Sequence, residues 1–336
     1  MSANEFQASV TALAVGLAVL GAFALHLDAP WWAAISAWIV GNPERGAVLN
    51  KGVARVIGTA AGGFLGYVAA YVTLGMPLLQ IPVIALSLSA AAYLRYRSEH
   101  AYMWLMLLVM ISLSVLNAMT TPEETLDFVF FRSTEIMLGV TAATIAAISL
   151  DAWRPATSAP DTAAGHGTVP RKAARFVALF SGFTTLLILL IWQQLALPSS
   201  MQILISLIAT AMPTFAMTQA QIAKRLAGCV LGGAAGLMLT GLSLEVLTVW
   251  LALFFVGIYA LAYVHHGGGA YSYVGTQGGI GFIMATVSGT GPTETIIPVF
   301  DRIAGISIAM VLMVCLIYAA SPWLSSAYAG HQAPAS

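Results

Sequence analysis

The stretch RVIGTAAGGFLG spans residues 55–66, and RLAGCVLGGAAG spans residues 225–236. The two stretches are identical at five of their twelve positions, an arginine and four glycines, and lie 170 residues apart. The same offset places Pro43 on Pro213. Because one offset aligns separate features, the sequence predicts two tandem copies of one structural unit.

The composition indicates that lipid is the main solvent of this chain. Hydrophobic residues make up 59% of its 336 residues and charged residues 8%, whereas a typical soluble domain carries about 25% charge. So few charges do not cover a water-facing surface of this size. The net charge is zero, which gives no reason to expect a nucleic-acid partner.

Twelve apolar runs approach the length of about 20 residues that a membrane-spanning helix needs. They cover about residues 8–25, 30–49, 52–74, 77–95, 101–119, 125–150, 173–193, 198–217, 222–241, 244–264, 270–289 and 296–320. Six spans per unit is an even number, so both units enter the membrane from the same side. The predicted fold is an all-α integral membrane protein with twelve transmembrane helices, arranged as two parallel six-helix repeats with pseudo-two-fold symmetry.

A polar stretch rich in Pro, Ser and Gly divides the chain near its middle and is typical of a flexible linker. The predicted division is therefore a first six-helix repeat (1–151), a cytoplasmic linker (152–172), a second six-helix repeat (173–322) and a cytoplasmic tail (323–336). No Lys or Arg precedes the first apolar run, so that run is predicted to be an uncleaved span rather than a signal peptide.

The basic residues predict the orientation in the membrane. Eleven of the thirteen fall in or beside the loops on the side of the N terminus, and the opposite side is acidic. Because cytoplasmic loops carry an excess of Lys and Arg, both termini and the linker are expected in the cytoplasm.

The glycines of the repeated stretch are expected to pack helices together. They have small-xxx-small spacing, which lets helix backbones approach closely in lipid. Phosphate binding is disfavoured, because these glycines have helical spacing and follow no strand. The predicted packing positions are Gly58, Gly62, Gly66, Gly228, Gly232 and Gly236.

Proline interrupts the second span of each unit at Pro43 and Pro213, and Asn42 precedes the first of them. Interrupted helices at matching positions of two repeats often mark the binding site of a transporter. The alternative is that Pro43 only ends a short helix in a loop. Both interpretations remain open for these three residues.

Arg132 and Arg302 are the two basic residues on the acidic side, and the 170-residue offset pairs them. Each lies about seven residues into the last span of its unit, where an arginine is costly unless it is paired or faces a cavity. Two guanidinium groups are suited to bind a carboxylate. Snorkelling to the lipid headgroups is the alternative. Glu135, one turn from Arg132, is the candidate for proton coupling.

Two further residues are candidates for substrate contact. Trp38 lies near the middle of its span and is placed to stack on an aromatic substrate, although most such residues belong to interfacial belts. Gln277 puts an amide at membrane depth in a glycine-rich span. His265 and His266 lack acidic or cysteine neighbours at ligand spacing and are interpreted as solvated loop residues. No metal, cofactor or catalytic constellation is expected, so the chain is not predicted to be an enzyme.

The residues also carry a family resemblance. The segments Pro30-Trp31-Trp32-Ala33 and Ile39-Val40-Gly41-Asn42-Pro43, followed by Arg55-x-x-Gly58-Thr59 and by Arg132 with Gly139, resemble the fusaric acid resistance family of aromatic acid exporters. Plant aluminium-activated malate transporters, which are anion channels, look like distant relatives. The resemblance implies efflux of aromatic carboxylates, driven by the proton gradient, and in bacteria often a periplasmic membrane-fusion partner.

The expected function is therefore export of small organic, in particular aromatic, carboxylates across a bacterial inner membrane. A passive anion channel and a non-transporting membrane scaffold are the alternatives. The expected partners are the organic anion and the lipid bilayer, and the sequence leaves open a homo-oligomer.

Overall fold

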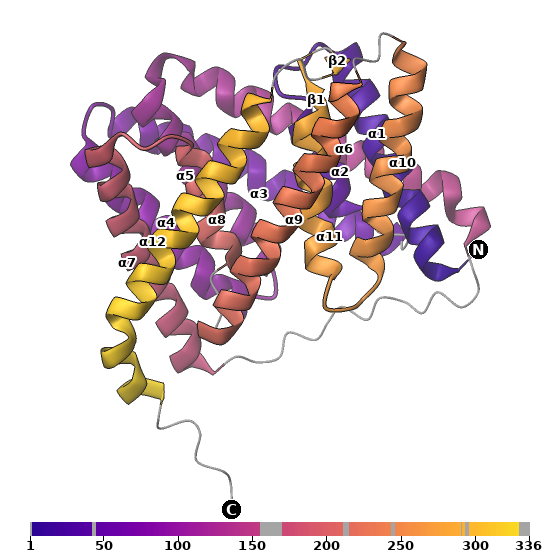
Figure 1. Cartoon of the computed structure of the whole chain (residues 1–336). Helices are drawn as coiled ribbons and strands as arrows, with labels where there is room; N and C mark the ends of the chain where they lie inside the picture. The colour runs from indigo at the N-terminus through magenta and orange to yellow at the C-terminus, as the bar shows by residue number, and fades with distance from the viewer. Residues whose placement is uncertain are drawn as a thin grey trace, which may run out of the picture.

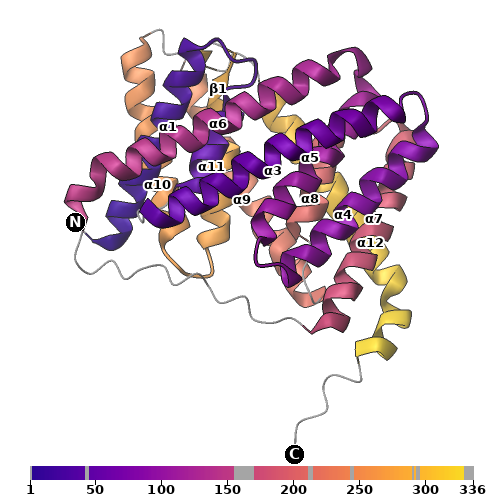
Figure 2. The ribbon, with the colours of Figure 1, turned by 180° about the vertical axis from the view of Figure 1, so that it is seen from behind.

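The computed structural model describes residues 2–41, 45–154, 170–210, 215–242, 246–289, 291–292 and 296–328. Helices dominate these ranges, because a backbone in lipid has to satisfy its polar groups internally. Figures 1 and 2 show them as one bundle of crossing helices. The α-helices are α1 (Ala3–Ala24), α2 (Trp31–Val40), α3 (Arg45–Val72), α4 (Pro77–Arg97), α5 (Ala101–Thr120), α6 (Thr125–Leu150), α7 (Arg171–Leu195), α8 (Ser200–Thr210), α9 (Phe215–Gly241), α10 (Leu247–His266), α11 (Ser272–Thr286) and α12 (Ile297–Tyr328).

Short elements complete the described chain. Two 3₁₀ turns, η1 (Pro122–Glu124) and η2 (Asp151–Trp153), flank α6. After α11 the chain forms a two-residue antiparallel pairing, β1 (Val287–Ser288) with β2 (Gly291–Pro292). The predicted linker and tail lie largely outside the described residues, so the division into four segments stays a prediction.

Nine helices in the described ranges are long and apolar enough to cross a membrane. The other three are shorter than the spans predicted for them, with 10 residues in α2, 11 in α8 and 15 in α11. At a rise of 1.5 Å per residue, helices of this length do not cross a hydrocarbon core of about 30 Å. The all-α membrane class is thus correct, whereas a full span at each of the twelve positions is not observed.

Two helices begin earlier than predicted. α3 begins at Arg45 and α9 at Phe215, about seven residues before the predicted starts of these spans. Arg55 and Arg225, which the sequence placed near the starts of their spans and beside the cytoplasmic loops, therefore lie ten residues into α3 and α9. They are also buried, with 3% and 2% of their surfaces exposed.

The helices of the two predicted units interlock. α1 packs on α10, and α4 packs on α7. Each unit also pairs its third and fifth helices, α3 with α5 and α9 with α11. The contact pattern therefore runs in the same order in both units, while their superposition stays a prediction.

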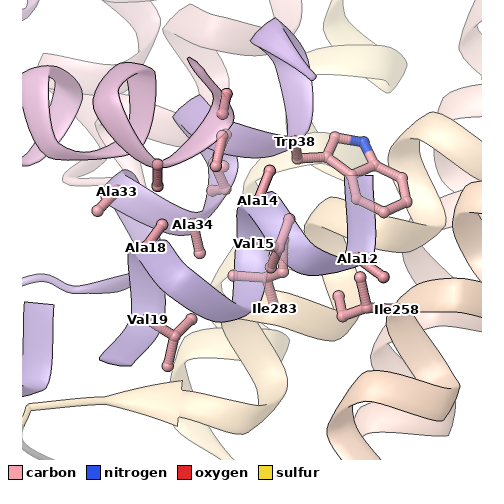
Figure 3. Packing of buried hydrophobic residues seen from close by; sticks show 14 of the residues in the cluster. Ala12, Ala14, Val15, Ala18, Val19, Ala33, Ala34, Trp38, Ile258 and Ile283 are labelled. Atoms are coloured by element: carbon pink, nitrogen blue, oxygen red, sulfur yellow. The ribbon is translucent and has the colours of Figure 1, made fainter. Parts of the chain in front are cut away.

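The largest hydrophobic cluster joins the two units. It contains residues of α1, α2 and α6 from the first unit and of α10 and α11 from the second, and these helices gather on one side of the bundle in Figure 1. Figure 3 shows small side chains of α1 and α2 packed beside Trp38, Ile258 and Ile283. Alanines and valines allow this closeness, since they add little bulk between the helix axes.

The outer surface of the bundle is apolar. Large hydrophobic side chains such as Leu78, Leu179 and Leu231 are 83%, 72% and 63% exposed. A water-soluble monomer rarely exposes extended apolar surface of this kind. These faces are suited to contact lipid chains.

The glycines of the repeated stretch lie where helices touch. A Cβ atom on Gly62 would overlap the backbone of Leu107 in α5, and one on Gly232 would overlap the backbone of Gly278 in α11. Gly58, Gly66, Gly228 and Gly236 likewise face neighbouring helices at distances too short for a side chain. The backbone of a neighbouring helix does not move aside as a flexible side chain would, so these positions require glycine.

Gly62→Leu and Gly232→Leu are each expected to reduce the yield of folded protein severely, because the leucine would force two packed backbones apart. Folded yield after detergent extraction and size-exclusion chromatography measures the effect. Gly241→Leu is the matched control, since no atom of another described element lies within 4 Å of a Cβ at that position. Equal yields for all three variants would contradict the packing role.

Candidate functional site

Arg302 lies in the second turn of α12 and is buried inside the bundle, with 5% of its surface exposed. Its Nη1 donates to Gln202 Oε1 of α8 at 3.2 Å and contacts Met284 Sδ of α11 at 3.2 Å. Its Nη2 donates to Gln277 Oε1 at 3.3 Å. All three partners are neutral, and the Cys229 side chain lies at the same amide with Sγ 3.8 Å from Gln277 Oε1, so no carboxylate of the described residues pairs with Arg302.

A second buried arginine meets the same amide. Arg225 of α9 donates from Nη1 to Gln277 Oε1 at 2.8 Å and from Nε to Ser206 Oγ at 3.4 Å. Arg225 and Arg302 therefore share one amide oxygen. Arg225 Nη2 and Arg302 Nε are buried and find no hydrogen-bond partner among the residues that the structure describes. We call Arg225, Gln277 and Arg302 the arginine–glutamine cluster.

The arginine–glutamine cluster is electrostatically incomplete. Within the described part of the chain, the one ion pair joins Arg132 to Glu135, far along the sequence from this cluster. Burial of two like charges without a counter-charge is unfavourable in a low-dielectric interior. An anion placed between the guanidinium groups would compensate the charge and would accept from the free N–H groups.

The first unit has a different arrangement around Arg132. Arg132 Nη1 donates to Glu135 Oε2 at 2.7 Å, and the guanidinium lies over the rings of Trp32 at 4.6 Å and Phe128 at 5.0 Å. The other oxygen of Glu135 accepts from the backbone N–H of Ala29 at 2.8 Å, at the start of α2. Arg132 is thus neutralised by its own helix, and both oxygens of Glu135 are engaged.

The two arginine environments occupy matching positions in the sequence. The offset of 170 residues that pairs Arg132 with Arg302 also pairs Trp32 with Gln202. An aromatic ring below the guanidinium in the first unit is thus replaced by an amide in the second. Glu135 pairs with Gly305, so the second unit lacks the neutralising carboxylate at that position.

Arg55 is the first-unit counterpart of Arg225. It donates to Tyr102 OH at 2.7 Å and to Ser36 Oγ at 3.2 Å, and it contacts Met106 Sδ at 3.4 Å. Met106 in α5 lies against Gly58 and contacts Arg55, as Gln277 in α11 lies against Gly228 and contacts Arg225. The bridging amide that joins two arginines is therefore a feature of the second unit.

Some of the remaining residues that the sequence analysis singled out lie in the described structure, and others lie outside it. Trp38 is fully buried and stacks on His265 at 5.4 Å between ring centroids, so it lies apart from any interfacial belt. The interpretation of His265 and His266 as solvated loop residues is wrong, because both end α10 and contact α1, α2 and α11. Asn42, Pro43 and Pro213 lie outside the described residues.

Sequence reasoning missed Arg225 because it counted this residue as a loop charge. The repeated Arg-x-x-Gly spacing was the signal for it, since an arginine that recurs beside packing glycines has to lie on a buried helix face. No group of three or more His, Cys, Asp or Glu side chains suited to hold a metal occurs in the described ranges. The chemistry that the arginine–glutamine cluster offers is reversible binding of an anion.

Comparison with known proteins places this chain in a family. The model of the Fusaric acid resistance protein family matches residues 7–182, which is more than half of the chain. The chain belongs to this family. The match ends in α7, so the arginine–glutamine cluster lies in the part of the chain beyond it.

The curated relatives of this chain include efflux pump subunits. The p-hydroxybenzoic acid efflux pump subunit AaeB of Shigella boydii serotype 4 (strain Sb227) is 30% identical over 146 residues, covering 40% of this chain and 22% of the relative. AaeB of Escherichia coli O1:K1 / APEC matches with the same identity and coverage. The match therefore covers about a fifth of the length of those relatives. No solved structure matches this chain.

Proposed function

We propose that this protein exports small organic carboxylates, in particular aromatic ones, across the bacterial inner membrane in exchange for protons. The observation that carries the proposal is the arginine–glutamine cluster, in which two buried guanidinium groups share one neutral amide oxygen. A carboxylate fits this place because its two oxygens accept from two separate donors. The name of the relatives, a p-hydroxybenzoic acid efflux pump subunit, supports an aromatic acid as the carboxylate.

The burial of the arginine–glutamine cluster suits a transporter that closes around its substrate. Arg225 and Arg302 are almost inaccessible in this conformation, so a substrate enters only when helices move. α8 and α11 carry the polar partners of Arg302 and are among the three short helices. Short helices at membrane depth end inside the bundle, and their ends are natural places for such movement.

Reconstitution in liposomes tests the proposal. The purified full chain should accumulate labelled p-hydroxybenzoate when a pH gradient is imposed and should not accumulate p-hydroxybenzyl alcohol, which lacks the carboxylate. Equilibration without accumulation would identify a passive anion channel instead. No flux with any aromatic acid tested would favour a membrane scaffold.

We infer that the protein works with a further subunit, because the relatives are named as pump subunits. A periplasmic membrane-fusion protein is the class of partner that would extend export beyond the inner membrane. Co-purification of the tagged chain from a bacterial membrane after crosslinking tests this inference. Recovery of the chain alone, or only as copies of itself, would count against a fusion partner.

Topology is a separate prediction. With both termini in the cytoplasm, Lys172 is expected on the cytoplasmic side and Glu123 on the periplasmic side, because basic residues concentrate in cytoplasmic loops. Both side chains are exposed. Single cysteines at these positions, in a background without Cys229 and Cys315, should react with an impermeant maleimide from opposite sides of the membrane. Labelling of both from one side would reject the orientation.

A further inference from the structure

Two histidines lie at the contact between the predicted units. His265 and His266 end α10, and their rings are 4.6 Å apart between centroids, inclined at 51°. We call them the histidine pair. α10 belongs to the second unit, but it packs on α1 of the first unit, so the histidine pair lies where the units meet.

Each ring is held by a threonine hydroxyl from a different unit. His266 Nε2 lies 2.8 Å from Thr11 Oγ1 of α1, and Thr11 is completely buried. His265 Nδ1 lies 2.7 Å from Thr276 Oγ1 of α11. A hydroxyl both donates and accepts, so these contacts persist whether the ring nitrogen carries a proton or not.

Trp38 connects the histidine pair to the interior. Its indole stacks on His265 with an angle of 28° between the ring planes. On the other side it meets α11, where a Cβ atom on Gly279 would overlap the indole ring. Figure 3 shows the indole reaching from α2 towards the second-unit helices. A change in the charge or position of the His265 ring therefore directly alters the packing of α2 against α11.

The groups around the histidine pair are mostly uncharged. The neutral partners are Thr11 of α1, Trp38 of α2 and Thr276 of α11. Among the described residues, Lys51 of α3 is the charged side chain whose field acts on both rings. The carboxylate of Glu5 on α1 is engaged in the cap of its own helix. Two protonated rings at 4.6 Å beside Lys51 would repel one another strongly, so the histidine pair takes up at most one proton.

The other contact between the units lacks such a group. The offset of 170 residues places His265 and His266 on Arg95 and Tyr96 of α4, and Thr11 on Ser181 of α7. Arg95, Tyr96 and Ser181 line a cavity of about 20 Å³ between α4 and α7. Imidazole is the side chain whose charge changes near neutral pH, whereas Arg and Tyr keep theirs. One of the two equivalent contacts therefore carries imidazole groups, which are able to exchange a proton.

We propose, on the basis of the function proposed above, that the histidine pair binds the proton that drives carboxylate export. Protonation adds a charge beside Lys51 and under the indole of Trp38. The packed contact of α1 and α2 with α10 and α11 then becomes unfavourable, and the units move apart on this side. Release of the proton to the cytoplasm restores the contact.

Tryptophan fluorescence tests proton binding without any transport assay, because a protonated imidazole quenches a stacked indole. The signal of Trp38 is taken as the difference between the full chain and its Trp38→Phe variant in nanodiscs. This signal should fall on acidification in the parent and in the His100→Asn control, whose histidine is exposed in a loop. It should not change with pH in the His265→Asn variant. The same pH profile in the parent and His265→Asn would overturn the proposal.

Transport tests the coupling. The His265→Asn/His266→Asn variant should lose all accumulation driven by a pH gradient and should still exchange labelled for unlabelled p-hydroxybenzoate. Accumulation equal to that of the parent would overturn the proposal, and so would loss of exchange together with accumulation, which indicates a structural role. A parent that moves no aromatic acid would refute the proposed function, while the fluorescence titration would still decide whether the histidine pair binds a proton.

Discussion

Arg302→Gln and Arg225→Gln are each expected to lower p-hydroxybenzoate transport by about tenfold or more. A hydrogen bond to a charged group contributes about 1.5–3 kcal/mol, and about 1.4 kcal/mol corresponds to a factor of ten. Arg→Lys at either position should be nearly as harmful, since lysine provides the charge without the planar fork that binds a carboxylate in two places. Initial rates in proteoliposomes, normalised to the folded protein, measure the loss.

Stability separates this role from a structural one. Removing a buried charge that no carboxylate of the described residues neutralises relieves an unfavourable contribution to the folding free energy. The thermal midpoint of the two glutamine variants should therefore equal or exceed that of the parent. Arg97→Gln, at an exposed position at the end of α4, is the control and should change neither transport nor stability.

Ligand binding gives a third measurement. A carboxylate that binds the folded state raises the thermal midpoint in proportion to its affinity. Added p-hydroxybenzoate should stabilise the parent and should not stabilise Arg302→Gln or Arg225→Gln. If both variants transport and respond to the ligand like the parent, the carboxylate is held elsewhere, and the environment of Arg132 becomes the next candidate.

The order of the helices was predictable because hydropathy reports which segments are apolar enough to lie in lipid. An apolar run of sufficient length forms a helix whatever its neighbours are, and most predicted boundaries lie within a few residues of the observed ones. The lengths of α2 and α11 were not predictable in the same way. These two helices lie in the interior, where neighbouring helices replace lipid, so the apolar sequence continues past the residues at which they end.

The contacts between helices of the two predicted units could not be predicted from the sequence, for a related reason. The small residues of α1 and α2 show that another helix comes close, but they do not specify which one. Trp38 illustrates the limit. Its indole fits because α11 offers Gly279 at the point of contact, and this complementarity becomes evident only when two segments distant in the sequence are seen together.

The candidate site was predictable in part. Arg302 and Gln277 were singled out because a charged side chain and an amide side chain are unusual at membrane depth. The structure brings the two together. Arg225 was missed because it follows Lys224 and resembles a loop charge. The histidine pair was missed because it ends an apolar run and is followed by three glycines, a pattern that is typical of exposed loops.

Glu135→Gln is expected to destabilise the protein substantially. The carboxylate accepts from Arg132 Nη1 and from the N–H of Ala29, and it is completely buried. Breaking a buried ion pair by removing one partner costs about 3–5 kcal/mol, because the remaining charge has no compensation. The thermal midpoint and the folded yield in detergent should both fall.

The paired variant Arg132→Gln/Glu135→Gln should recover much of that loss, because it removes both charges together. The double-mutant cycle then measures how strongly the two residues depend on each other. Strong dependence would assign Arg132 and Glu135 to holding α6 against the start of α2, and would leave carboxylate binding to Arg225 and Arg302. Parental stability of Glu135→Gln would instead mean that Arg132 reaches water or an anion from solution. In that case Arg132 would qualify as a substrate residue, and Glu135 would again be a candidate for proton coupling.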